Sequence, residues 1–350
     1  MRTGISPPII DRRSLLGALA ASLALPLRAF AATITDSTGR KVTTPGTVAR
    51  VYPAGPPAQV FIYSLAPDLL VGWVEAIGPQ AREFLLPEIA ARPQVPRLTG
   101  RGNDSVDLEA LKTFKPDLIV DIGNVGPSFK SLAERVEQQS GIPYAVLDGH
   151  FDQTVATYRA LAQLTGRGDA ADKLTRYVES TIATVKERSA AVPKEARPRV
   201  YYARDGSGLQ TGLGGSMISE SIEFVGARNV AADLHGSHGA ATLEQIRAWN
   251  PEIIIASDAD FATRVRSDRD WAGISAVKSG RIHLSPKFPF GWVDFPPAVN
   301  RLIGLWWLGS IFYPDRFPED VKARTRDFYT LFYHVTPTDA QIERVLAGQG

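Results

Sequence analysis

Two stretches of this chain repeat one another: residues 107–121, DLEALKTFKPDLIVD, and residues 242–256, TLEQIRAWNPEIIIA. Aligned at a constant offset of 135 positions, they share ten identities or close substitutions in fifteen positions, and the proline stays in register. Chance does not readily produce that density of matches. We therefore interpret the chain as two similar lobes built on one plan.

Each copy of the repeat predicts a short helix followed by a strand. Asp107 or Thr242 can cap the helix start, because its side-chain oxygen accepts an orphan backbone N–H. The residue before the proline is disfavoured in helical geometry and ends the helix. The apolar run that follows, LIV or III, is typical of a strand buried on both faces of a parallel sheet. The repeat thus predicts the α/β class, with two Rossmann-like lobes.

Length and composition narrow the possible functions. A chain of 350 residues can form two domains, each with its own core. It contains no cysteine, which excludes disulfides, thiolate catalysis, cysteine-ligated zinc, iron–sulfur clusters and a lipid anchor carried on cysteine. Residues 1–31 carry four arginines and one aspartate, which leaves 35 basic and 36 acidic residues, a net charge of −1. We expect no nucleic-acid partner from that balance.

The first 31 residues predict an export signal. DRRSLL at residues 11–16 leads into an apolar run, residues 14–27, that is too short to span a membrane, and AFA at residues 29–31 is a small-x-small cleavage site. DRRSLL resembles the twin-arginine signal, which exports folded proteins, and a general-secretion signal is the alternative. We expect a periplasmic protein that carries no lipid anchor.

The remaining chain divides around one long helix. We expect an N-terminal α/β lobe over residues 32–165, a connecting helix within residues 166–195, and a C-terminal α/β lobe with terminal helices over residues 196–350. The connecting helix is predicted from the uninterrupted helical pattern of residues 170–191, which ends before the proline-containing PKEARP.

Five stretches together carry a resemblance to a known family. They are TDSTGRKVTTP (35–45), VDLEALKTFKPDLIV (106–120), SMISESIEFVGARNVA (216–231), TLEQIRAWNPEIIIAS (242–257) and AVNRLIGLWWLGSIFYPDRF (298–317). Over about residues 48–315 the chain resembles periplasmic substrate-binding proteins of the iron-complex and vitamin B12 uptake family. The resemblance implies two lobes joined by one rigid helix, a ligand between them, and an ABC permease and ATPase as partners. Family ligands are ferric siderophores, haem, cobalamin, nickel complexes and molybdate-type oxyanions.

The ends of the predicted strands select candidate ligand contacts, because ligands of open α/β sheets sit outside the carboxyl ends of strands. In the first lobe the candidates are Tyr63, Ser64, Arg101, Asn103, Asn124 and His150. In the second lobe they are Arg204, His235, His238, Phe290 and Trp292.

Two of these second-lobe candidates suggest an anionic or aromatic ligand. Arg204 directly follows the predicted strand RVYYA, where its guanidinium could hold a carboxylate or phosphate by two parallel bonds. The alternative is an ion pair with Asp205 or another acid. The stretch PFGWVDFPP, residues 289–297, concentrates aromatic side chains among prolines. Its aromatic groups either line a pocket for a planar chelate or plug a gap between helices.

Direct metal binding has weaker support. His235 and His238 in the loop HGSH could converge on one metal, or both could be surface residues. No carboxylate at ligand spacing completes the set. We therefore expect a monomer without a cofactor of its own, which binds a small-molecule metal chelate. Iron is the first choice, followed by haem iron, nickel or cobalt, and a ferric siderophore-like complex is the leading prediction.

Two other functional classes stay open beside a carrier. A chelatase on the related two-lobed plan would use inward-facing His235, His238 and Glu244, but the export signal argues against it, so we do not expect an enzyme. A ligand sensor cannot be separated from a carrier by sequence. The family resemblance also implies one acidic residue on each lobe that pairs with importer arginines. The candidates are Glu83 or Glu88 in the first lobe and Glu220 and Glu223 in the second.

Overall fold

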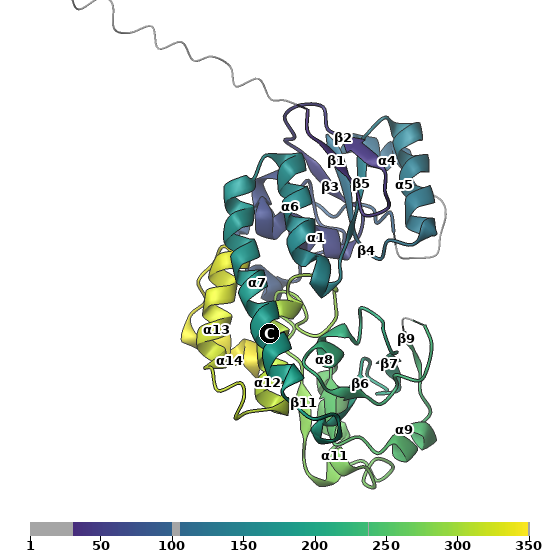
Figure 1. The fold of residues 1–350 in the computed structure, drawn as a ribbon, viewed down its shortest axis with the longest axis vertical. Helices are drawn as coiled ribbons and strands as arrows, with labels where there is room; N and C mark the ends of the chain where they lie inside the picture. The colour runs from purple at the N-terminus through teal and green to yellow at the C-terminus, as the bar shows by residue number, and fades with distance from the viewer. Residues whose placement is uncertain (1–30, 100–105, 237, 349–350) are drawn as a thin grey trace, which may run out of the picture. The chain divides into compact units, whose positions relative to one another are not determined.

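The structure is a computed structural model that describes residues 31–99, 106–236 and 238–348 (Figure 1). Except for Ala31, the predicted export signal lies outside these ranges. Within them no helix combines the length and the apolar character needed to cross a membrane.

The first lobe is built on a parallel three-stranded sheet in the order β3–β4–β5. These strands are β3 (Val51–Pro53), β4 (Leu118–Gly123) and β5 (Tyr144–Asp148). An antiparallel hairpin joins β1 (Thr33–Thr35) to β2 (Lys41–Thr43). Helices α1 (Pro56–Leu65) and α6 (Thr154–Thr165) cover one face of the sheet, and α4 (Leu108–Thr113) and α5 (Pro127–Ser140) cover the other. Short segments complete the lobe: η1 (Pro67–Leu69), α2 (Pro79–Arg82), α3 (Pro87–Ala90) and η2 (Phe151–Gln153).

The second lobe repeats this plan with a parallel four-stranded sheet in the order β11–β10–β6–β8. Its strands are β6 (Arg199–Ala203), β8 (Arg228–Asn229), β10 (Ile253–Ala256) and β11 (Ile282–Leu284). An antiparallel pair is formed by β7 (Gln210–Gly212) and β9 (His238–Ala240). The helical segments are η3 (Lys194–Ala196), α8 (Glu220–Phe224), α9 (Leu243–Trp249), α10 (Ala259–Arg264) and α11 (Ser275–Lys278).

The two copies of the repeat supply equivalent elements of the two lobes. In each copy the predicted cap accepts a backbone N–H three residues on: Asp107 from Ala110 and Thr242 from Gln245. The strand after the proline, β4 or β10, is paired on both sides within its sheet. Its residues are buried on both faces, as the apolar runs predicted. The duplication inferred from the sequence is therefore present in the fold.

A single long helix, α7 (Gly168–Ala190), joins the lobes and packs against α6 of the first lobe and α8 of the second (Figure 1). The predicted architecture of two α/β lobes joined by one helix is confirmed. The C-terminal elements are α12 (Arg301–Phe312), α13 (Val321–Phe328), the π-helical segment η4 (Tyr329–Tyr333) and α14 (Asp339–Leu346). These C-terminal elements also contact the first lobe. The segment η4 packs on α1, and Tyr63 Oη donates a hydrogen bond to the Tyr333 carbonyl at 2.7 Å.

One hydrophobic core runs through both lobes. Alternate residues of β4 and of β10, such as Val120 and Ile255, contribute to the same cluster as α1, α7 and α12. The opposite faces of the two sheets pack into separate clusters, one in each lobe. Because interiors are packed as densely as organic crystals, this shared core holds the lobes in a defined relation to each other. It thereby positions the strand ends that border the cleft.

Candidate ligand-binding cleft

Two cavities lie between the lobes at the carboxyl ends of the strands. Cavity 1 has a volume of about 410 Å³ and cavity 2 of about 390 Å³. Both fall in the range of small-molecule sites. Cavity 1 is bordered mainly by Gln59, Glu75, Ile77, Arg204, Lys287, Phe290 and Asp294. Cavity 2 is bordered mainly by Arg97, Thr99, Asp121, Asn124, Ser216 and Met217.

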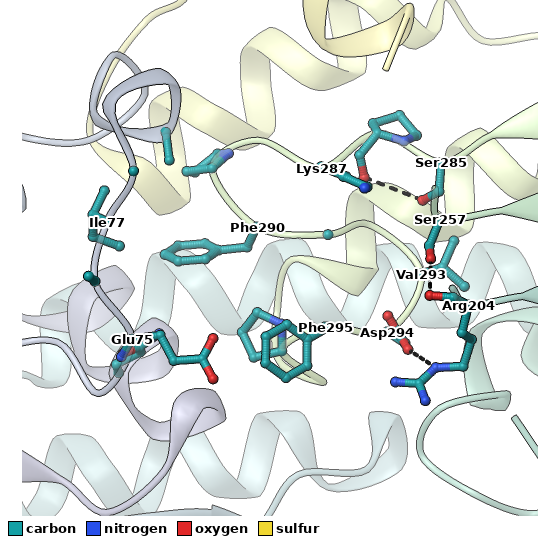
Figure 2. A pocket seen from close by; sticks show the side chains of 18 of the residues that line it. Glu75, Ile77, Arg204, Ser257, Ser285, Lys287, Phe290, Val293, Asp294 and Phe295 are labelled. Atoms are coloured by element: carbon teal, nitrogen blue, oxygen red, sulfur yellow. Dashed lines mark hydrogen bonds and ion pairs between the residues drawn. The ribbon is translucent and has the colours of Figure 1, made fainter. Parts of the chain in front are cut away.

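Charged side chains border cavity 1 from both lobes: Glu75 from the first, and Arg204, Lys287 and Asp294 from the second. Figure 2 shows Glu75 and Ile77 on one side of the cavity and Arg204 with Asp294 on the other. Arg204 follows β6, and its Nε donates to Asp294 Oδ2 at 2.6 Å. Burial opposes the charge on Arg204, but the neighbouring carboxylate outweighs burial and raises the guanidinium pKa. Arg204 therefore forms an ion pair, which was the alternative prediction for this residue. Its partner is Asp294 and not Asp205.

Gln59 offers a hydrogen-bond donor to cavity 1 from the first lobe. Its side chain is buried in α1, and its Oε1 accepts the backbone N–H groups of Val74 at 2.8 Å and Glu75 at 3.3 Å. No described residue accepts a hydrogen bond from its Nε2 group. A buried amide donor normally has a partner, so this NH₂ group is available to a solute in the cavity.

Asp121 gives cavity 2 a buried acid in the second half of β4. Its carboxyl oxygens accept hydrogen bonds from Thr99 Oγ1 at 3.2 Å and Tyr144 Oη at 3.5 Å. Burial raises the pKa of Asp121 to about 7, although these hydroxyls and the charge of Arg97 oppose the change. Near neutral pH, cavity 2 therefore contains a carboxyl group that is partly protonated.

Phe295 borders both cavities. In Figure 2 its ring lies between the first-lobe wall and the Arg204–Asp294 pair. It is 46% exposed, and it stands alone among the described residues as an exposed large hydrophobic side chain. An exposed aromatic ring inside a concave site is a typical contact for a ligand with apolar surface.

Three of the predicted contact residues reach these cavities. Arg204 and Phe290 border cavity 1, and Asn124 borders cavity 2. All three follow a strand or belong to the aromatic–proline stretch, so local sequence was sufficient to find them. Arg101 and Asn103 lie outside the described residues.

Tyr63 and Ser64 do not face the cleft, and the prediction that they do is corrected. Both lie in the last turn of α1, which is apolar on all sides and buried all round. Tyr63 Oη accepts the Leu86 N–H at 2.8 Å, and Ser64 Oγ bonds with Tyr158 Oη at 2.6 Å. The helix directs both side chains into the core, away from the strand ends that border the cleft.

The prediction that Trp292 contacts the ligand is also corrected. The Trp292 side chain is fully buried and packs in the hydrophobic core together with α12. It lines neither cavity. A Cβ atom at Gly304 of α12 would lie 1.8 Å from the Trp292 carbonyl oxygen, so the backbone of this stretch rests directly on the helix. The exposed aromatic ring of the stretch is that of Phe295.

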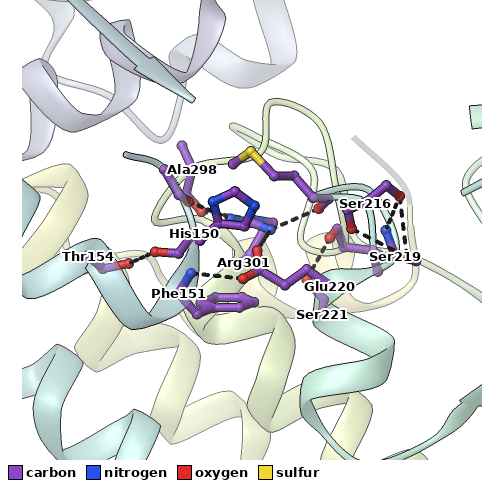
Figure 3. Close-up of polar contacts among 12 residues, drawn as sticks. His150, Phe151, Thr154, Ser216, Ser219, Glu220, Ser221, Ala298 and Arg301 are labelled. Carbon is purple, nitrogen blue, oxygen red and sulfur yellow. Dashed lines mark hydrogen bonds and ion pairs between the residues drawn. The ribbon is translucent and has the colours of Figure 1, made fainter. Parts of the chain in front are cut away.

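His150 lies beside a buried ionic network outside both cavities (Figure 3). Its Nδ1 is 2.6 Å from Asp148 Oδ1, and this hydrogen bond raises the pKa of the imidazole. Next to it the guanidinium of Arg301, 1% exposed, lies over the Phe151 ring and contacts Glu220 Oε2 at 2.7 Å. His150 is therefore a neighbour of the lobe junction and does not line a cavity.

The histidine pair does not form a metal centre in the described structure. His235 and His238 are exposed, and neither borders a cavity, although Gly236 between them borders cavity 2. Nowhere in the described ranges do three or more His, Cys, Asp or Glu side chains cluster in a way that could hold a metal ion. Direct ligation by the pair would require further ligands from elsewhere.

The four glutamates proposed for docking differ in the contacts that their carboxylates already make within the protein. Glu220 Oε1 accepts the Phe151 N–H at 2.9 Å, while Oε2 binds Arg301. Glu223 accepts from Asn229 Nδ2 at 3.2 Å, and Glu83 pairs with Arg344. Glu88 is exposed and has no described ion-pair partner. Docking by any of them stays a prediction.

Sequence reasoning missed several residues that border the cleft. Gln59, Glu75, Thr99, Asp121, Lys287 and Asp294 were not selected. Asp121 could have been found, because it stands at the strand end of the first repeat, where the strand-end rule applies. The others lie in helices or irregular segments that only the packing of the lobes brings to the cleft.

A family model and a curated protein both match this chain over more than half of its length. Residues 89–287 match the family model described as periplasmic binding protein. The molybdate-binding protein MolA of Haemophilus influenzae is 25% identical over 340 residues, which cover 87% of this chain and 91% of MolA.

Solved structures also match the fold of this chain. An ABC transporter solute binding protein from Sulfurospirillum deleyianum matches with a TM-score of 0.82 and 25% identity, covering 89% of this chain and 98% of that protein. Helicobacter pylori CeuE in its Ni-His complex matches with a TM-score of 0.71, covering 91% and 99% of the two chains. At 18% identity, the CeuE match reflects the fold alone.

Proposed function

The chain belongs to the periplasmic binding protein family, as the resemblance of its sequence predicted, and on that premise we propose that it captures a metal chelate for an ABC importer. It binds the solute between its lobes and presents it to a membrane permease and its ATPase. A ferric siderophore-like complex is the leading candidate, ahead of haem, cobalamin and nickel complexes. The bound metal is cargo, and the protein performs no chemistry on it.

Phe295 carries this proposal. Its half-exposed ring stands between two cavities that together border both lobes. Exposing an aromatic ring to water is unfavourable, and a ligand with an organic face removes that cost when it covers the ring. An organic chelator that spans both cavities provides such a face, whereas an isolated ion does not.

The polar groups around Phe295 suit the periphery of a chelate. The amide donor of Gln59 and the ammonium of Lys287 border cavity 1 beside the Arg204–Asp294 pair. Because Arg204 is already paired with Asp294, its guanidinium offers hydrogen bonds more than uncompensated positive charge. Groups of this kind recognise chelator oxygens and leave the metal inside its own ligand shell. The lack of a described cluster of metal-binding side chains accords with that mode.

A molybdate-type oxyanion is the second candidate, and one observation favours it. MolA, named for molybdate binding, aligns with 87% of this chain. A tetrahedral oxyanion would use Gln59, Lys287 and Arg204 as donors in cavity 1 and would leave Phe295 uncovered. The two candidates therefore differ in whether Phe295 contributes to affinity.

The experiment that tests the proposal identifies the solute directly. Native mass spectrometry of the protein purified from the periplasm of its own source should show an adduct whose mass and isotope pattern match a metal–organic complex. Calorimetric titration of ligand-free protein with a ferric trihydroxamate chelate and with molybdate then ranks the two classes. Binding of molybdate alone would replace the chelate proposal with the oxyanion one. Turnover of the chelate would contradict the carrier role.

A further inference from the structure

Asp121 occupies a position where the fold itself does not require an acid. The two copies of the repeat place Asp121 opposite Ala256, at the same offset of 135 residues and at equivalent places in the two central strands. Both residues are buried. Since the second lobe forms the same strand with alanine, the carboxyl group of Asp121 has another purpose than building the sheet.

The surroundings of Asp121 favour its neutral form. It is 3% exposed, and its described hydrogen bonds come from hydroxyl and backbone groups instead of from a cation. Among the described residues, the titratable groups near it are Arg97, Tyr144 on β5 and, on the other side of β4, Tyr52 on β3. Burial raises the pKa of both tyrosines well above their usual range, so both are neutral. Of these described groups only Arg97 carries charge, and its Nη1 lies 3.8 Å from Glu75 Oε1.

The carboxyl group also borders open space. Asp121 lines cavity 2 together with Thr99 and Asn124. Gly55 packs closely against this pair, because a Cβ atom there would stand 2.7 Å from Thr99 Oγ1 and 3.8 Å from Asp121 Oδ1. A solute in cavity 2 therefore lies beside Asp121 and its hydrogen-bond partner Thr99.

We propose that Asp121 is a specificity-determining residue, which meets the solute as a neutral carboxylic acid and donates its O–H to a solute oxygen in cavity 2. This inference rests on the proposed function, which it deepens: cavity 2 takes the oxygen-rich side of the solute, bearing carboxylate, hydroxamate or oxo oxygens. A carboxylate at this position would repel such a group, so deprotonation of Asp121 weakens capture.

The consequence is a pH-dependent affinity with a defined sign. Burial raises the pKa of Asp121 to about 7, so the acid is protonated below that pH and releases its proton above it. Binding that requires the protonated form weakens by about tenfold for each pH unit above 7. At pH 8 the complex therefore takes up about one proton as it forms.

The test compares Asp121→Asn with Asp172→Asn by calorimetry. Asparagine keeps a neutral donor of similar shape, and Asp172 is an exposed acid on α7 that serves as the matched charge control. The probes are a ferric trihydroxamate chelate and molybdate, titrated at pH 6, 7, 8 and 9. Measurements at pH 8 use two buffers with different ionisation enthalpies, which report the number of protons taken up.

The expected result separates the variants. Wild type and Asp172→Asn should lose affinity above pH 7 and take up about one proton, while Asp121→Asn should bind with a flat pH profile and no uptake. If affinity fell with pH equally in Asp121→Asn and wild type, and both took up the same number of protons, the role of Asp121 would be overturned. Binding of a probe would still support the proposed function in that case. If wild type binds neither probe, the proposed function fails for both ligand classes, and this inference fails with it.

Discussion

Lys115 and Asn250, 135 positions apart, adopt the same left-handed backbone conformation, with a φ of 44° at each. Each stands directly before the proline of its repeat and ends the helix. For residues with a Cβ atom this conformation is strained, by roughly 1–2 kcal/mol, and asparagine tolerates it better than lysine. The strain recurs because both lobes need the chain to reverse sharply from helix to central strand.

We expect Lys115→Gly and Asn250→Gly to differ in their effect on stability. Glycine relieves the backbone strain at both sites, at the cost of greater chain entropy in the unfolded state. The Lys115 variant should gain about 0.5–1 kcal/mol. The Asn250 variant should gain nothing, because Asn250 Oδ1 accepts the Ser275 N–H at 2.8 Å and that bond contributes about 1 kcal/mol. Urea unfolding checks both, and equal shifts would contradict this account.

Phe295→Ala should weaken binding of an organic chelate by roughly five- to thirtyfold, since the lost ring contact is worth about 1–2 kcal/mol. Its effect on stability should be small because the ring is half-exposed. Phe290→Ala is the contrasting variant: Phe290 is buried against Trp73 and Tyr333, so its loss should cost about 3–5 kcal/mol of stability. Titration and thermal unfolding of both variants give the readout. Unchanged chelate affinity in Phe295→Ala would favour the oxyanion candidate.

Asp121 should make wild-type stability decrease as pH rises from 4 to 7. Its pKa increases from 3.8 to about 7 on folding, so between these values the folded state holds one proton that the unfolded chain has released. Stability then declines with pH by up to about 1.4 kcal/mol per unit and changes no further above pH 7. Asp121→Asn lacks this term, so it should match wild type near pH 4 and exceed it at pH 8. Parallel pH profiles in urea unfolding would show that Asp121 ionises normally.

The Arg301–Glu220 pair should prove essential to the lobe junction. Arg301 donates to the Met217 carbonyl of the second lobe at 2.9 Å and to the Gly149 carbonyl of the first at 3.0 Å. Arg301→Met leaves the Glu220 carboxylate without its cation, and Glu220→Gln leaves a buried guanidinium charge uncompensated. Each should cost about 3–5 kcal/mol, because breaking a buried pair exposes the full desolvation penalty of the remaining charge.

The double variant should cost much less than the two single variants together, because the residues are in contact. Arg228→Met, at an exposed arginine, is the control and should change stability by no more than about 0.5 kcal/mol. If Glu220→Gln left stability unchanged, Glu220 would be available for importer docking as the family resemblance implied. Glu88, exposed and without a described ion-pair partner, is otherwise the better first-lobe candidate for a charge reversal in transport assays.

Local sequence was sufficient wherever a short stretch decides its own structure. The caps, the prolines and the apolar runs of the two repeats predicted both central strands and hence the two-lobed fold, because helix termination and burial of a strand depend on neighbouring residues. Arg204 and Asn124 were found by the same logic, since each directly follows a strand.

Packing between distant segments decided the rest. Phe290, Trp292 and Phe295 lie in one irregular stretch, and contact with α12 directs Trp292 into the core and leaves Phe295 in the cleft. Tyr63 is buried by η4, which lies some 270 positions away. The protonation of Asp121 likewise depends on β5 and on the segment around Thr99. Side-chain direction in irregular segments, and the polarity around a buried acid, arise from contacts that residue order does not reveal.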